Sequence, residues 1–499
     1  MDKSELVLVF DCGSTNLRAA AVNPQGDILA QANCRNGPVR QPGGRPDWMI
    51  WDIDDIWSKL CGLSREVTKR VGSSSIKAVI VTTWGADGAP VKKDGALTYP
   101  VISWQCSRTR EVIEELTSRI SPWEIFRITG YQVISFNTLF KLLWLKKREP
   151  KALEEAYTWL MMPGLIVHRL TGEFHIDPTI ASTMMAMDMG RRDWSVEMLE
   201  QVGLDPNFFP EWKEPGEIVG YVRGDVADRC GLRANTPVVV GGEDTQYSFI
   251  SSKSEPYEAV LSSGTWEILG IRIDKYDPNE YAFRNGLTIE ADVLRGFWIP
   301  QILMIGSAVL EWIRKLLFTE VSSYESMVEE GRKIPVGSDG VVLIPSFVSD
   351  TGPTRRYGTK GTLLGLNLRI SRGHIYRAAL EGLSYQLRQA LQILSKATGI
   401  QVERIKVVGG GSKNELWNQI RANVTKTPVT ASLRSEATVV GAALMAFIGI
   451  DYYKSLEDAW KSMEKKEKHY LPIEVESKKY DEIFTKYIKL PPLLKDFYI

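Results

Sequence analysis

Chemistry-bearing residues gather first near the N-terminus, where an apolar run ends at Asp11 and is followed by Gly13, Ser14, Thr15 and Asn16. Gly13 permits close approach of another group, and the three polar residues offer hydroxyl, amide and backbone donors to an anion. Asp11 is placed to hold a cation, directly or through water, and Mg2+ is the usual companion of a phosphate. The pattern predicts a phosphate cradle beside a metal-binding carboxylate, and an ordinary polar hairpin is the alternative.

Two further carboxylates follow apolar strands. Asp87 comes shortly after the run 76–82, where an open α/β sheet places its ligand-contacting loops, and it could accept hydrogen bonds from hydroxyls. Asp244 follows Gly241-Gly242 and Glu243, which fits a carboxylate presented at the rim of a cleft. The alternatives are a hairpin turn at Asp87 and a solvated acidic loop at Asp244.

The pattern of the opening stretch returns near the middle of the chain. Residues 259–270 again read as strand, small polar turn and strand, and Gly264 is followed by Thr265 as Gly13 is followed by Ser14. A repeat with this spacing predicts two related domains that face each other across a nucleotide.

A third glycine-rich turn, Gly409–Gly411, follows the apolar run 405–408 and precedes a helix that begins near Asn414. Glycines at a strand end, next to a helix N-terminus, suit close approach of a flat or anionic group. The turn is neither a Walker loop, which ends in Gly-Lys-Ser/Thr, nor a clean GxGxxG motif. By itself it is a weak signal.

The elements that would position these residues alternate between apolar strands and amphipathic helices. We expect two strands within 6–22, strands at 28–33, 76–82 and 405–408, and helices at 53–70, 136–145, 375–394, 436–447 and 476–490, the last stopped by Pro491-Pro492. The small-residue helix 436–447 should pack tightly against a neighbour. In helix 136–145 we expect Trp144 in the core and Lys141 either solvated or ion-paired.

Composition excludes several classes of function. A chain of 499 residues exceeds the size at which one core keeps growing, so two domains are expected. Lys plus Arg equals Asp plus Glu at 61 each, which removes any general attraction for nucleic acid or an anionic membrane. The 4 histidines lack metal-ligand spacing, which argues against zinc catalysis and serine–histidine hydrolysis.

The same composition predicts a cytoplasmic location. The 5 cysteines are scattered without a CxxC pair, and the N-terminal residues lack the apolar core of a signal peptide. The longest near-uniform apolar run, 437–450, is shorter than the ~20 residues that span a bilayer. The sequence leaves the oligomeric state open, a homodimer included.

Taken together, the motifs resemble the FGGY carbohydrate kinases of the actin-like ATPase superfamily. The resemblance rests on four sites in this order: Asp11-x-Gly-Ser-Thr-x-x-Arg18, Gly242-x-Asp244-x-Gln246, Ser263-Gly264-Thr265 and Gly409-Gly410-Gly411-x-x-Asn414. A fifth pattern, at 136–145, agrees with it. It implies an α/β fold of two actin-like (ribonuclease H-like) domains with an interdomain catalytic cleft. Residues 1–250 would bind the sugar and supply the catalytic base, and residues 251–499 would bind the nucleotide, with the final helix docked on the body.

The resemblance also implies roles for single residues. Asp244 would be the catalytic base, Asp11 would organise Mg2+, and Asp87, Trp84 and Gln246 would contact the sugar. The residues that would contact ATP are Gly13, Ser14, Thr15, Arg18, Gly264, Thr265, Gly410 and Asn414. For Arg18 a structural salt bridge is the alternative.

Within the family, the segments 83–87, 102–106, 135–139, 244–246 and 262–267 look most like those of kinases that act on L-fuculose. The expected reaction is transfer of phosphate from ATP to the C1 hydroxyl of a 6-deoxyketohexose. Kinases of L-rhamnulose, xylulose or another ketose are the alternatives, and a non-enzymatic actin-like ATP-binding sensor or chaperone is an alternative from another class.

Two departures from family patterns bear on the substrate. Glycerol kinases carry an Arg-Glu pair near Gly85-Ala86, so a glycerol substrate is disfavoured. Fuculokinase-like sequences often have His before the catalytic Asp, where this chain has Glu243. An adjacent acid could raise the pKa of Asp244 or change sugar choice.

Overall fold

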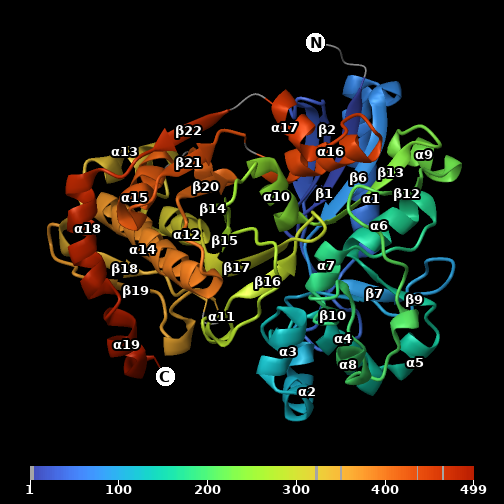
Figure 1. The fold of residues 1–499 in the computed structure, drawn as a ribbon, viewed down its shortest axis with the longest axis horizontal. Helices are drawn as coiled ribbons and strands as arrows, with labels where there is room; N and C mark the ends of the chain where they lie inside the picture. Colours follow the sequence, from blue (N-terminus) through green and yellow to red (C-terminus); the bar gives the residue numbers. More distant parts are fainter. Residues whose placement is uncertain (1–4, 321–323, 349–350, 435, 464–465, 499) are drawn as a thin grey trace.

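The computed structural model describes residues 5–320, 324–348, 351–434, 436–463 and 466–498. Two lobes lie side by side, the N-terminal half of the chain in blue to green and most of the C-terminal half in yellow to red (Figure 1). The boundary predicted at residue 250 falls near the end of helix α10, before strand β14 begins at Glu258.

The strands of the N-terminal half are β1 Leu6–Cys12, β2 Asn16–Val22, β3 Ile28–Arg35, β4 Val39–Arg40, β5 Met49–Trp51, β6 Ile76–Thr83, β7 Gly88–Val91, β8 Val101–Ile102, β9 Thr158–Met161, β10 Met187–Asp188, β11 Asp193–Trp194, β12 Ile218–Tyr221 and β13 Pro237–Glu243. Its helices are α1 Ile53–Val71, α2 Ile113–Arg119, α3 Pro122–Thr129, α4 Thr138–Arg148, α5 Pro150–Glu154, α6 Met162–Thr171, α7 Pro178–Ser182, α8 Val196–Glu200, α9 Gly224–Cys230 and α10 Asp244–Ser252.

The strands of the C-terminal half are β14 Glu258–Ser263, β15 Trp266–Gly270, β16 Thr288–Ala291, β17 Trp298–Ile305, β18 Val342–Ile344, β19 Thr362–Leu364, β20 Arg404–Val408, β21 Val429–Ser432 and β22 Glu467–Tyr470. Its helices are α11 Glu280–Arg284, α12 Ala308–Leu317, α13 Tyr324–Arg332, α14 Arg372–Thr398, α15 Glu415–Thr425, α16 Ala437–Gly449, α17 Leu456–Ser462, α18 Glu474–Tyr487 and α19 Leu490–Leu494.

Each lobe is built on one mixed sheet. The N-terminal sheet has the order β12-β13-β6-β1-β2-β3, in which β1 is antiparallel to β2 and parallel to β6. The C-terminal sheet has the order β16-β17-β15-β14-β20-β21-β22, in which β14 is antiparallel to β15 and parallel to β20. The two hairpins occupy equivalent places in the two sheets, so the predicted structural repeat is confirmed.

Alternation along β1 explains why its sheet is covered on both faces. Leu8 and Phe10 belong to the apolar cluster that contains α1, whereas Val7 and Val9 belong to the cluster that contains α16. All four side chains are fully buried. A strand buried on both faces reads as a continuous apolar run, as this one does.

Helix α16 comes from the C-terminal half of the sequence but packs on β1 and β6 of the N-terminal sheet and against α10 (Figure 1). A Cβ atom at Gly441 would lie 1.9 Å from the backbone oxygen of Tyr247, so only glycine permits this approach. The predicted tight packing of this small-residue helix is confirmed.

The segment between β6 and β13 holds a second apolar cluster, around α4. Trp144 is 1% exposed within it, which confirms its predicted place in the core. Lys141 is also buried and forms an ion pair with Asp87, so the ion-paired alternative is confirmed and the solvated one is wrong.

The C-terminal helix α18 packs on α15, and its Tyr480, Phe484 and Tyr487 lie around Tyr385 of α14. It ends at Tyr487, earlier than expected. Pro491 and Pro492 do not stop it but open α19, because proline is tolerated in the first turn of a helix. Over the described ranges, no helix combines the length and apolarity needed to cross a membrane.

Candidate active site

The first hairpin places Asp11 opposite Arg18, and the Arg18 Nη1 atom lies 3.4 Å from the Asp11 Oδ2 atom. The same guanidinium forms an ion pair with Glu436, at the start of α16. Arg18 therefore forms the salt bridge that was its predicted alternative role, and it links the two halves of the sequence beside Asp11. A role in charge compensation stays a prediction.

The turn between β1 and β2 is tight. The Gly13 backbone N–H donates to the Asn16 carbonyl over 2.9 Å, and a Cβ atom at Gly13 would meet that same oxygen at 2.9 Å. Ser14 is half-buried and Thr15 is exposed, so their hydroxyls lie at the surface of the turn. The turn can therefore offer donors to an anionic ligand.

Asp244 is the first residue of α10, directly after β13, and its side chain is half-buried. Glu243 caps the helix, since its Oε2 atom accepts a hydrogen bond from the Gln246 backbone N–H at 3.1 Å. Glu243 is 8% exposed and ends a strand, so the solvated-loop alternative is wrong. A helix N-terminus stabilises an anionic side chain at the position of Asp244.

The carboxylates of Asp11 and Asp244 lie in one electrostatic environment. Burial is the largest cause that raises the pKa of Asp11 to about 7, the charge of Asp244 raises it further, and the charge of Arg18 opposes both. Loss of contact with water also raises the pKa of Asp244. Two acids that are far apart in the sequence thus share one site and repel each other when both are ionised.

Two glycines allow β13 to carry Asp244 into this position. A Cβ atom at Gly241 would lie 1.9 Å from the Val81 carbonyl oxygen of β6, and one at Gly242 would lie 2.2 Å from the Thr179 Oγ1 atom. No larger residue fits at either position.

Glu290, on β16 of the C-terminal sheet, is a residue of this region that no sequence motif had indicated. Its Oε2 atom accepts a hydrogen bond from the Gln246 Nε2 atom at 2.7 Å, and burial raises its pKa to about 7. The Oε1 atoms of Gln246 and Gln301 are buried without a hydrogen-bond partner among the described residues. The only sequence signal was an acid within the run Thr288–Ala291.

Burial, and then the charges of Asp244 and Glu290, raise the pKa of Glu243. The three carboxyls therefore cannot all ionise without cost, and the neutral ones can donate as well as accept hydrogen bonds. With the unpaired amide oxygens, this group has the polar atoms that a polyhydroxylated ligand requires.

Asp87 is fully buried beside Trp84. Its Oδ2 atom accepts hydrogen bonds from the indoles of Trp51 (2.6 Å) and Trp84 (2.9 Å) and from the Trp104 backbone N–H (3.1 Å), and Lys141 pairs with its Oδ1 atom. The hairpin-turn alternative is wrong, because β7 pairs with β9 rather than with β6. In this conformation Asp87 anchors Trp84, and its direct contact with a sugar stays a prediction.

The second hairpin lies against the glycine-rich turn. The Gly264 carbonyl accepts a hydrogen bond from the Ser307 hydroxyl at 2.8 Å, and Thr265 is exposed. A Cβ atom at Gly411 would lie 2.0 Å from the Ser263 Oγ atom, so this glycine is required for the two turns to meet. The second hairpin and the glycine-rich turn thus lie together in the C-terminal lobe.

The glycine-rich turn also has open space beside it. A Cβ atom at Gly410 would meet nothing within 4 Å. Asn414 caps α15, since its Oδ1 atom accepts from the Trp417 backbone N–H at 3.1 Å, and its Nδ2 atom donates to the Tyr376 hydroxyl at 2.9 Å. Contact of Gly410 and Asn414 with adenosine stays a prediction.

A buried ion pair contacts the second hairpin at Ser263. Arg421 and Glu267 are both 0% exposed and paired, and the Arg421 Nη2 atom also donates to the Ser263 hydroxyl at 2.7 Å. The arginine stacks on Trp417, with its Cζ atom 3.6 Å from the ring centre. No pattern in the sequence pointed to this pair.

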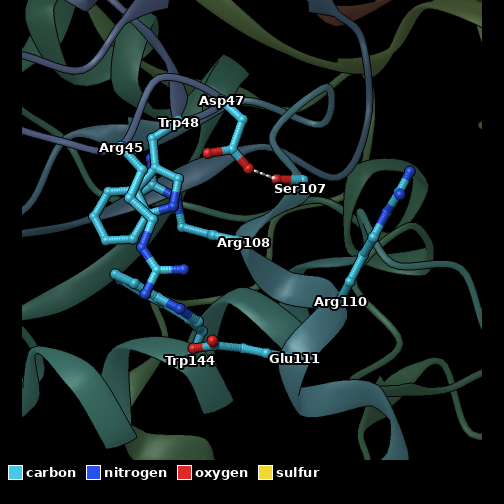
Figure 2. Close-up of a pocket in the computed structure, with 8 residues that line it drawn as sticks. All are labelled: Arg45, Asp47, Trp48, Ser107, Arg108, Arg110, Glu111 and Trp144. Carbon is cyan, nitrogen blue, oxygen red and sulfur yellow. Dashed lines mark hydrogen bonds between the residues drawn. The ribbon is translucent and has the colours of Figure 1, made fainter.

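A cavity of about 280 Å3 lies apart from these residues, next to α4. Figure 2 shows its lining, in which the Arg108 guanidinium lies 4.3 Å from the ring centre of Trp48 and 5.1 Å from that of Trp144. None of the predicted site residues lines it. We therefore do not assign it to the active site.

Asp11 has the chemistry of a magnesium ligand. Among the described residues no three or more His, Cys, Asp or Glu side chains form a group that could hold a metal. Mg2+ typically uses only one or two protein carboxylates, with phosphate oxygens and waters as its other ligands. The repulsion between Asp11 and Asp244 is the kind that a bound cation relieves, so the residues present fit Mg2+.

Two family models match most of the chain. Residues 6–251 match the model of the N-terminal domain of the FGGY family of carbohydrate kinases, and residues 259–450 match that of its C-terminal domain. The chain is 40% identical to the L-fuculokinase of Escherichia coli (strain K12) over 457 residues, which cover 92% of this chain and 95% of the relative. It is 36% identical to the L-fuculokinase of Haemophilus influenzae over 476 residues, which cover 94% and 99%.

The crystal structure of xylulose kinase from Rhodospirillum rubrum superposes with a TM-score of 0.87 at 22% identity, over 99% of this chain and 100% of the other. At that level of identity the likeness establishes the fold, which is the two-domain actin-like fold expected from the sequence.

Proposed function

Because this chain belongs to the FGGY family of carbohydrate kinases and is an ATP-dependent sugar kinase, we propose that it phosphorylates the C1 hydroxyl of a 6-deoxyketohexose, with L-fuculose as the substrate. The observation that carries the proposal is the 40% identity to an L-fuculokinase over 92% of the chain. Xylulose kinases match at lower identity, 23% for that of Bacillus subtilis. The non-enzymatic alternative is set aside, and the cytoplasmic location stays a prediction from the sequence.

Asp244 is the proposed catalytic base. Phosphoryl transfer to an alcohol needs a carboxylate that takes the hydroxyl proton late in the reaction. Asp244 begins a helix, is half-buried, and has a raised pKa, which makes it a better proton acceptor than an exposed aspartate. Neighbouring Glu243 holds the first turn of α10, where Asp244 lies, by accepting from the Gln246 backbone N–H.

The nucleotide is proposed to lie between the two hairpins. Gly13, Ser14 and Thr15 would bind phosphates from one side and Gly264 and Thr265 from the other, each through turns that leave donors at the surface. Mg2+, when bound through Asp11, supplies charge compensation for the transferring phosphate. Arg18 holds Asp11 and adds positive charge there.

Sugar recognition is proposed to use Gln246 and the neighbouring acids. The unpaired Gln246 Oε1 atom can accept hydrogen bonds from hydroxyls, and the carboxyls of Glu243 and Glu290 can accept them or, when neutral, donate them. Trp84 would offer an apolar face to the sugar, and Asp87 holds that indole in place. A site rich in buried polar groups discriminates strongly against a substrate that leaves them unpaired.

The test is a panel of ketoses with purified protein, ATP and Mg2+, in which ADP release is measured. We expect the highest kcat/KM with L-fuculose, at least about 10-fold above L-rhamnulose and D-xylulose, a ratio that one or two lost hydrogen bonds provide. Highest kcat/KM with D-xylulose or L-rhamnulose would refute the substrate and leave the sugar kinase assignment standing.

A further inference from the structure

Two buried cysteines from distant parts of the sequence meet in the N-terminal lobe. The Cys61 Sγ atom of α1 lies 2.7 Å from the Cys230 Sγ atom, at the end of α9. The side chains are 2% and 0% exposed, and both are free thiols. A disulfide bond is about 2.05 Å long, so the sulfur atoms would have to approach by less than about 1 Å to form one.

The contact is fixed by the packing of the two helices. Gly231, which ends α9 with a φ of +66°, approaches α1 so closely that a Cβ atom there would lie 2.7 Å from the Thr68 Oγ1 atom. The Ser64 hydroxyl of α1 donates to the Cys230 carbonyl at 2.7 Å. These contacts hold the end of α9 against α1 next to the two sulfur atoms.

The surroundings shift the pKa values of the two thiols in opposite directions. Its hydrogen bond with Cys230 lowers the pKa of Cys61, against the effect of burial, and the charges of Arg229, Arg65 and Arg169 lower it further. The same hydrogen bond and burial raise the pKa of Cys230. The nearby arginines favour the thiolate, which is the nucleophilic form of cysteine.

We propose that Cys61 and Cys230 form a redox pair, which closes to a disulfide bond between α1 and α9 when the protein meets hydrogen peroxide. The Cys61 thiolate attacks one peroxide oxygen, the O–O bond breaks, and the products are a Cys61 sulfenic acid and hydroxide. The Cys230 sulfur then attacks the Cys61 sulfur as its own S–H bond breaks, and the sulfenic hydroxyl leaves with that proton as water. In total, two thiols and one peroxide give one disulfide and two waters.

The disulfide would stabilise the N-terminal lobe without reshaping the active site. Helix α1 packs on β2 and β3, and α9 lies just before β13, the strand that leads to Asp244. The bond closes a loop between residues 169 positions apart, and a long loop gives a large restriction of the unfolded chain. The sulfur atoms are already in contact, so β13 need not move.

The test treats the purified full chain with hydrogen peroxide, blocks remaining thiols with N-ethylmaleimide, and maps peptides by mass spectrometry without reduction. We expect a linked peptide pair that contains Cys61 and Cys230 and disappears after reduction. We also expect a rise of roughly 5–10 °C in the unfolding midpoint, reversed by dithiothreitol. Cys34→Ser, at a half-buried cysteine of β3, is the matched control and should show both effects.

Cys61→Ser and Cys230→Ser should lose the linked peptides and the shift of the midpoint. The proposal is overturned when oxidised wild-type protein contains no such link, when Cys61 proceeds to sulfinic acid instead, or when the link involves Cys34. Peptide mapping of the wild-type protein distinguishes these outcomes by itself, so the proposal can be refuted even when a serine variant folds poorly.

Discussion

Replacement of Asp244 by Asn tests the central claim about the site, because a catalytic base and a structural carboxylate respond in opposite ways. A general base contributes about 10²–10⁴-fold to the rate, which is roughly 3–5 kcal/mol of transition-state stabilisation. We therefore expect kcat to fall at least about 100-fold while ATP still binds. The variant keeps the size and helix position of the side chain and removes only its charge.

The same change should make the protein more stable at pH 8 without Mg2+. Burial, and next the charge of Asp244, raise the pKa of Asp11 from 3.8 to about 7, a shift that corresponds to roughly 4 kcal/mol. A share of about 1 kcal/mol should return when that charge is removed. A raised pKa of this kind contributes stability below pH 4 that is lost as the pH rises through 7, so the gain should appear above pH 7 and vanish near pH 4.

Activity is measured by ADP release at saturating ATP and sugar, and stability by urea unfolding in EDTA at pH 8. Asp177→Asn is the matched control, since burial also raises the pKa of Asp177 to about 7 and Asn can still cap α7. We expect its kcat to stay within a few-fold of wild type. If Asp244→Asn keeps kcat within tenfold of wild type, or loses activity and stability together, the base assignment is wrong.

Three other changes follow from the packing. Lys141→Met leaves the buried Asp87 carboxylate without its cation and should lower the free energy of unfolding in urea by about 3–5 kcal/mol. Adding Asp87→Asn to the same chain should restore part of this loss, and no recovery in the double variant would contradict the ion-pair account. Glu290→Gln should increase the free energy of unfolding by roughly 1–3 kcal/mol at pH 8 and have little effect at pH 4.5, because burial raises the pKa of Glu290 to about 7. Equal effects at both pH values would count against this pKa. Gly441→Ala places a Cβ atom 1.9 Å from a backbone oxygen of α10 and should lower the free energy of unfolding by about 3 kcal/mol. Gly62→Ala, with open space around it on α1, should raise it by about 0.5–1 kcal/mol. Similar stabilities for the two variants would show that α16 and α10 are not tightly packed.

The local sequence pattern predicted much of the fold, because both sheets begin with the same arrangement of apolar and polar residues. An apolar run, a small polar turn and a second apolar run specify a hairpin wherever they occur, so β1–β2 and β14–β15 were both found. The parallel strands β6 and β20 were found because strands buried on both faces read as continuous apolar runs. Spacing of the two copies then indicated two related lobes.

Charged groups that are buried by distant partners could not be identified in this way. Lys141 allowed two interpretations until its partner Asp87 was placed beside it. Glu290 has no acidic or basic neighbour in its own strand, and its partner Gln246 belongs to the other half of the fold. A single-sequence pattern reports the period of an element, whereas the burial of a charge depends on which elements pack together.

The residues themselves therefore determined the kind of chemistry that we expect: carboxylates at or near the ends of apolar strands, glycine turns suited to phosphate, and a duplicated architecture. Those features are local, since backbone conformation and hydropathy act over a few residues. Only the tertiary structure decided that Arg18 joins Asp11 to α16, and that two cysteines 169 positions apart touch. Such contacts form when distant elements pack together, because that packing decides which side chains are buried against each other.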